Sequence, residues 1–147
     1  MKIVAACRTL NEERNVERFV KAYRTFADEI LIADGGSEDR TVEFAINAGA
    51  KVRPFCEMIQ ASAGGKRNPH GSHINLCINW AWEEGADWVI FDDCDDVPTL
   101  ALQEKVREIF EITPFNHIGV FRLYLYGETE YYPDLNLPGQ SIWAWRW

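Results

Sequence analysis

The stretch "WVIFDDCDDVP", residues 88 to 98, runs four apolar residues into four carboxylates that surround a single cysteine, Cys94. A short, continuously apolar run is typical of a strand that is covered on both faces, as strands of a parallel sheet are. The acidic residues follow where that strand would end. In open α/β sheets, ligands bind beyond the carboxyl ends of the strands, so the stretch predicts both a fold class and the edge where function lies.

Working outward from this stretch, apolar runs alternate with helical patterns along the whole chain. Further strands are expected at Ile3–Cys7, Glu29–Ala33, 50–55 and, as one long strand, 117–127. Helices are expected between them, the clearest in residues 11–26, where apolar residues recur with the spacing of one helix face. Such alternation predicts an α/β domain with a mainly parallel central sheet and helices on both faces.

Residues that start or stop helices punctuate this pattern. Asn11 is a candidate cap for the first helix, and Thr99 is one for the helix that follows the acidic stretch. Gly49 and Gly85 stand where the second helix and the helix of residues 72–84 should end.

Composition excludes several classes of function. The net charge is −8, which argues against nucleic acid as a partner because phosphate binding needs clustered lysine and arginine. No apolar run reaches the roughly 18 residues of a membrane-spanning helix. Four cysteines occur without a CxxC pair and no secretory signal is visible, so we expect a reduced, cytoplasmic protein without a transmembrane segment.

Three polar loops follow the first, second and fourth predicted strands: "CRTLNEE", "DGGSEDRT" and "DDCDDVP". In an extended segment Asp93 and Asp95 would face one site while Cys94 faces the opposite side. Carboxylates crowded together favour a divalent cation such as Mg²⁺ or Mn²⁺, which binds through one or two carboxylates plus substrate phosphates. A solvated acidic turn is the alternative interpretation. Neither GxGxxG after the first strand nor P-loop spacing in "ASAGGKRN" is found.

The segments "TLNEERNVERFV", "ILIADGGSEDRTVEFA" and "ADWVIFDDCDDVP", in this order, resemble motifs of the family 2 glycosyltransferases with the GT-A fold. The resemblance covers about residues 1 to 100, the nucleotide-binding half. It implies a GT-A (Rossmann-like) three-layer sandwich and an inverting transfer from a nucleotide-diphosphate sugar to an acceptor hydroxyl. It also implies Mn²⁺ or Mg²⁺ held by a DxD motif. The acceptor, whether saccharide, lipid or protein, is not indicated.

The resemblance assigns roles to residues of the first two motifs. Thr9, Asn11 and Glu12 match residues that line the nucleoside pocket, and Asp34 matches an aspartate that contacts the base. A second aspartate of that motif is replaced by Gly35, which leaves the base contact to one carboxylate.

The diphosphate and the metal are assigned in the same way. Asp93 would lie near the ribose and the metal, and Asp95 would be the main metal ligand. Lys66 and Arg67 fall where the family often has a basic residue facing the diphosphate, although a solvated pair is equally expected. Ser37 belongs to the loop whose glycines let the backbone approach a ligand.

The remaining acidic residues are less specific. Asp92 occupies a position that is usually apolar in the family, and Asp96 is a candidate outer-shell residue. The general base is expected in the second half of the domain, where the candidates are Glu128, Glu130 and Asp134.

The sequence ends in "SIWAWRW", whose alternation places Trp143, Trp145 and Trp147 on one face. We expect core packing, or a strand edge that pairs with further sequence, more than stacking on an acceptor sugar. On this interpretation residues 1–147 form one domain truncated at its C-terminus, with 1–100 as the nucleotide-sugar-binding half and 101–147 as the start of the acceptor side. Such a chain could form a homodimer through its last strand.

Two other functions remain open from the sequence. A non-catalytic nucleotide-sugar-binding module, or pseudoenzyme, would keep the nucleotide pocket without a base. A nucleotidyltransferase would also hold a metal with carboxylates, but that class opens with a glycine-rich loop after its first strand, and "CRTLNEERN" contains no glycine.

Overall fold

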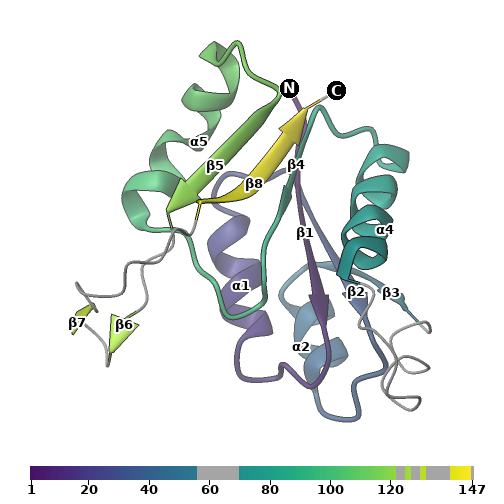
Figure 1. The fold of residues 1–147 in the computed structure, drawn as a ribbon. Helices are drawn as coiled ribbons and strands as arrows, with labels where there is room; N and C mark the ends of the chain where they lie inside the picture. The colour runs from purple at the N-terminus through teal and green to yellow at the C-terminus, as the bar shows by residue number, and fades with distance from the viewer. Residues whose placement is uncertain (56–69, 122–124, 127–129, 132–139, 147) are drawn as a thin grey trace.

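A computed structural model of the chain describes residues 1–55, 70–121, 125–126, 130–131 and 140–146. Its centre is a six-stranded sheet with the strand order β3-β2-β1-β4-β8-β5 (Figure 1). The strands of this sheet are β1 (Ile3–Thr9), β2 (Glu29–Asp34), β3 (Lys51–Pro54), β4 (Trp88–Phe91), β5 (His117–Phe121) and β8 (Gln140–Arg146). The helices are α1 (Val16–Tyr23), α2 (Thr41–Asn47), α4 (His70–Glu83) and α5 (Leu100–Ile112).

Four neighbouring strands, β3, β2, β1 and β4, run parallel, as predicted. Their register sets the strand ends beside one another, because Thr9 lies opposite Asp34, and Ala6 opposite Phe91. Val89 and Ile90 of β4 are fully buried. The continuous apolar run is therefore a strand covered on both faces, and its acidic continuation emerges at the same edge as the ends of β1 and β2.

The prediction of one long strand over residues 117–127 reaches beyond the described residues. Its first part is present, because β5 covers His117–Phe121 and pairs with β8, with Phe121 opposite Gln140. Leu125–Tyr126 (β6) pairs instead with Glu130–Tyr131 (β7) in a separate two-stranded sheet.

Helices cover both faces of the main sheet, so the expected three-layer arrangement is confirmed (Figure 1). One apolar core joins α1, α2 and α5 to the sheet, and the other joins α4 to the opposite face. Residues of β1 alternate between the two cores: Cys7 belongs to the first, Val4 and Ala6 to the second. In the described part of the chain, no helix has the length and hydrophobicity needed to cross a membrane.

The helix ends follow the sequence signals in three cases out of four. Gly49 and Gly85 adopt the left-handed conformation just after α2 and α4, and the Thr99 hydroxyl accepts a hydrogen bond from the backbone N–H of Leu102. Asn11 does not cap α1, which begins only at Val16. Its side chain is used between two loops instead, as described below.

The C-terminal strand β8 lies inside the sheet and not at its edge. It runs antiparallel to both neighbours, with Ala144 opposite Ile90 of β4 on one side and Ile118 of β5 on the other. Within the described residues, Ala144 therefore has a partner strand on each side. A homodimer through this strand, which the sequence suggested, stays a prediction.

Asp92, the first residue after β4, is a buried carboxylate. It is 6% exposed and accepts a hydrogen bond of 2.6 Å from the hydroxyl of Tyr23 on α1. The Tyr23 ring is fully buried and stacks on Phe19 with ring centroids 4.3 Å apart. Buried charge is costly unless it is hydrogen-bonded, so this contact ties the start of the acidic segment to α1.

We expect Tyr23→Phe to lower the free energy of unfolding by about 1–2 kcal/mol, because a buried carboxylate loses a donor. Urea unfolding followed by circular dichroism measures this cost. In an Asp92→Leu background no carboxylate needs the hydroxyl, so the same substitution should cost close to nothing. An equal cost in both backgrounds would show that the effect is general packing of the ring.

Candidate functional site

The loops that follow β1 and β2 are joined to each other by hydrogen bonds. The backbone N–H of Gly35 donates to the carbonyl of Thr9 at 2.8 Å, and the N–H of Glu12 donates to the hydroxyl of Thr41 at 2.7 Å. The Glu12 carboxylate in turn accepts from the side-chain amide of Asn15. The structure therefore brings Thr9, Glu12 and Gly35, three of the predicted substrate-binding residues, into one rigid assembly.

Asn11 has a positive φ of 58°, a conformation that asparagine tolerates better than most residues. From this position its backbone N–H donates to the Ser37 hydroxyl, and its side-chain oxygen accepts from the N–H of Glu38, both at 2.9 Å. The residue thus connects the first loop to the second through two opposite groups. Asn11 does form hydrogen bonds with backbone and side-chain groups, but its partners lie in the second loop and not at the start of a helix.

Asp34, which is 5% exposed, is the centre of this assembly. One carboxylate oxygen accepts from the hydroxyls of Thr9 and Ser37, and the other accepts from the backbone N–H groups of Gly36 and Ser37. A carboxylate has about four lone-pair positions, and four donors already address them. Contact of Asp34 with a base stays a prediction; the hydrogen bonds described here give it a structural role.

Asp39 closes the second loop onto α2. Burial acts to raise the pKa of its carboxyl, but the hydroxyl and the N–H of Thr41 and the N–H of Glu13 donate to it. Their combined effect holds the pKa below its ordinary value. Asp39 is therefore a charged anchor between the two loops.

The acidic segment after β4 turns and does not continue as a strand. The N–H of Asp96 donates to the carbonyl of Asp93 at 3.0 Å, which closes the turn. Cys94 is 3% exposed and packs into the core with α1 and α5, whereas Asp95 is exposed. Cys94 is therefore turned into the core while Asp95 lies at the surface, but a turn produces this arrangement, and the expectation of extended backbone here is wrong. That Asp93 and Asp95 face one site stays a prediction.

Two arginines that sequence reasoning did not single out contact this acidic turn. Arg8, near the end of β1, forms an ion pair with Asp93, with Nη2 and Oδ1 3.7 Å apart. Arg18 of α1 donates to the backbone carbonyl of Asp95 at 3.1 Å. A signal was available for Arg8, because a charged side chain directly after the five apolar residues Ile3–Cys7, all fully buried in a central strand, is exceptional.

Several predicted site residues cannot be placed. Lys66, Arg67, Glu128 and Asp134 lie outside the described residues. For Glu130 only the backbone, in β7, is described. Their roles at the diphosphate and as general base stay predictions.

No group of three or more histidine, cysteine, aspartate or glutamate side chains with the arrangement of a metal site occurs in the residues that the structure describes. Asp93 and Asp95 offer oxygen ligands only, which suits Mg²⁺ or Mn²⁺ but does not fill a coordination shell. The donor set therefore fits a metal ion that is completed by substrate phosphates and water, as these ions usually are at nucleotide sites.

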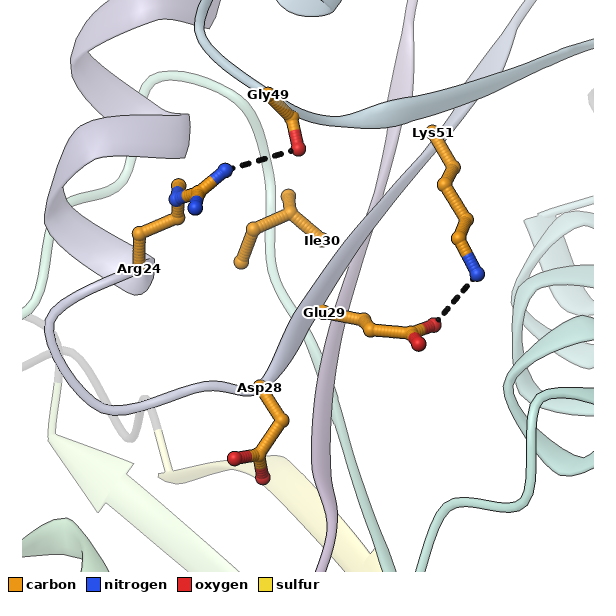
Figure 2. A pocket seen from close by; sticks show the side chains of 6 residues that line it. All are labelled: Arg24, Asp28, Glu29, Ile30, Gly49 and Lys51. Carbon is orange, nitrogen blue, oxygen red and sulfur yellow. Dashed lines mark hydrogen bonds and ion pairs between the residues drawn. The ribbon is translucent and has the colours of Figure 1, made fainter.

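A small pocket lies at the other end of the sheet, near the start of β2 and β3 (Figure 2). Its charged groups already pair with neighbouring atoms: Lys51 contacts Glu29 at 3.0 Å, and the Arg24 guanidinium donates to the Gly49 carbonyl. The pocket is lined by Arg24, Asp28, Glu29, Ile30, Gly49 and Lys51. Because it faces away from the carboxyl ends of the strands, it is not part of the candidate site.

Comparison with known structures confirms the fold. The chain resembles residues 1–349 of S. aureus TarS with a TM-score of 0.54 and 20% identity, over 76% of this chain and 33% of that one. It resembles mannosyl-3-phosphoglycerate synthase from Rubrobacter xylanophilus with a TM-score of 0.53 and 20% identity, over 78% and 37% of the respective chains. The architecture is that of the GT-A glycosyltransferases.

Sequence comparison then gives the family. Residues 8–146 match the family model "Glycosyl transferase family 2", and the chain belongs to this family. An uncharacterized glycosyltransferase of Rickettsia conorii is 30% identical over 111 residues, which are 74% of this chain and 34% of that protein. A Rickettsia bellii relative is 29% identical over the same length. The chain spans about a third of the length of these relatives.

The two kinds of aspartate in the site should respond differently to neutralisation. We expect Asp34→Asn to lower the free energy of unfolding by about 2–3 kcal/mol, because an amide places donors opposite the donors that the carboxylate satisfies. Asp95→Asn, at an exposed position, should change it by less than about 0.5 kcal/mol. Urea denaturation of both variants gives the comparison, and similar losses would contradict the structural role assigned to Asp34.

Proposed function

We propose that this chain binds a nucleotide-diphosphate sugar with a divalent metal, and that the protein transfers the sugar to an acceptor hydroxyl with inversion. The observation that carries the proposal is the convergence of three polar loops at the carboxyl ends of β1, β2 and β4, in a chain of glycosyltransferase family 2. Membership of this family favours glycosyl transfer over the nucleotidyl transfer that the sequence alone left open.

In this proposal the nucleoside pocket is formed by the loops after β1 and β2, which are joined by hydrogen bonds. Thr9, Asn11 and Glu12 line it from one side, and the backbone at Gly35 and Ser37 from the other. Asp34 holds the two loops in place through the four hydrogen bonds that it accepts. Glycine in place of a second aspartate leaves room for the base to approach the backbone.

Asp93 and Asp95 would hold Mn²⁺ or Mg²⁺ at the turn after β4. The metal, when bound, stabilises the negative charge that develops on the leaving diphosphate. The chain supports this by keeping the turn in place: Asp92 is held by Tyr23, Cys94 is packed in the core, and Asp96 closes the turn on Asp93. Lys66 and Arg67 are the proposed further contacts to the diphosphate.

The acceptor side is less defined. A general base must take the proton of the acceptor hydroxyl as it attacks the sugar, and Glu128, Glu130 and Asp134 are the proposed candidates. The acceptor itself is an unidentified saccharide, lipid or protein hydroxyl.

Calorimetric titration with UDP and with GDP, each with and without Mn²⁺, tests the donor site. We expect one nucleotide to bind only with the metal, and Asp95→Ala to weaken that binding by about a hundredfold, because the principal metal ligand is lost. Glu104→Ala removes one negative charge at an exposed position of α5, outside the acidic turn, and this variant should bind as the unsubstituted protein does. Metal-independent binding, or equal binding by the Asp95 variant, would refute the proposal.

Sugar transfer needs a separate measurement. It uses a sugar nucleotide that carries the nucleoside diphosphate, UDP or GDP, found to bind in the titration. Release of the nucleoside diphosphate in the presence of a panel of acceptors would show a transferase. Tight, Asp95-dependent binding with no release for any acceptor would favour the pseudoenzyme alternative.

A further inference from the structure

Arg8 occupies an unusual place in the fold. Alternation along β1 places it on the same face as Val4 and Ala6, both of which pack against α4. Its charge is felt by Cys77 on that helix: burial raises the pKa of the Cys77 thiol to about 12, and Arg8 opposes part of this effect. Arg8 therefore stands on a central strand, and its positive charge lies at the edge of the sheet where the three loops converge.

Its contact with Asp93 is an ion pair of moderate strength. The guanidinium nitrogen and the carboxylate oxygen are 3.7 Å apart, longer than the 2.7–2.9 Å typical of a charge-assisted hydrogen bond. The Arg8 side chain is 21% exposed and that of Asp93 is 42% exposed, so solvent reaches both. Such a pair can be exchanged for other partners at modest cost.

The partner of Arg8 should depend on which charged ligands are bound at the site. A divalent cation on Asp93 would stand close to the Arg8 guanidinium, and two positive groups at this separation repel. A diphosphate brings two or more negative charges, and arginine binds such groups through its planar fork of donors. Metal alone is thus disfavoured beside Arg8, whereas metal together with diphosphate is favoured.

We propose that Arg8 binds the sugar-nucleotide donor: it pairs with Asp93 when no metal or nucleotide is bound, and it moves to the diphosphate when both bind. This inference rests on the proposed function. It assigns the diphosphate a ligand from β1 and explains why metal binding would depend on the nucleotide. In this scheme Arg8 and the metal ion compete for the carboxylate of Asp93.

The test uses Arg8→Met, which keeps the length of the apolar stem and removes the charge. Titration with Mn²⁺ alone should show binding about three- to tenfold tighter than in the unsubstituted chain. Titration with UDP, or with GDP if that is the nucleotide that binds, should at saturating Mn²⁺ show binding about tenfold weaker. These opposite changes cannot arise from general loosening of the turn, which would weaken both.

Two further variants sharpen the result. Arg8→Lys keeps the positive charge but loses the planar guanidinium. Compared with Arg8→Met, this variant should bind Mn²⁺ alone as weakly as the unsubstituted chain does, and it should regain only part of the nucleotide affinity. Arg107→Met breaks another arginine–aspartate pair, with Asp28, and should leave both affinities unchanged. Thermal unfolding followed by circular dichroism checks that each variant is folded.

Weaker binding of both ligands by Arg8→Met and Arg8→Lys, or no change in either, would overturn the role of Arg8 alone, provided that Asp95→Ala still weakens nucleotide binding about a hundredfold. Absence of Mn²⁺-dependent nucleotide binding in the unsubstituted chain would overturn the proposed function and this inference with it.

Discussion

The candidate site depends on one buried carboxylate, that of Asp34. Parallel strands end side by side, but the loops that leave them diverge toward different helices, and something must hold them together. Asp34 does so with four accepted hydrogen bonds, from Thr9 on the neighbouring strand and from its own loop. The cost of burying its charge is offset by these donors. The same carboxylate that closes the loops therefore fixes the geometry in which a nucleoside would be received.

Sequence reasoning recovered the architecture because its signals are local. The apolar run at Trp88–Phe91, the glycines that end two helices and the cap at Thr99 each follow from the chemistry of a few adjacent residues. The failures concern partners that are distant in sequence. Asn11 has the sequence context of a helix cap, but its partners are Ser37 and Glu38, more than twenty positions away. No local pattern contains that information.

The same distinction holds at the candidate site. The strand ends placed Thr9, Asp34 and Asp93 at one edge correctly, because parallel register follows from the order of elements. The pairings of Arg8 with Asp93 and of Tyr23 with Asp92 could not be foreseen, since each joins residues more than sixty positions apart. Both pairings concern charge. Composition reveals how much charge a chain carries, but only the fold decides which charges meet.

The position of β8 has a consequence for how this chain acquires its structure. Arg146 lies beside Trp88, more than fifty positions earlier in the sequence, so the sheet closes between β4 and β5 only after β8 has joined it. Until β8 pairs with it, β4 has a neighbouring strand of this sheet on one side only. Contacts of such long sequence separation slow folding and leave an exposed strand open to mispairing in the meantime. The strand that bears the acidic turn thus acquires its second neighbour only through a contact between segments distant in the sequence.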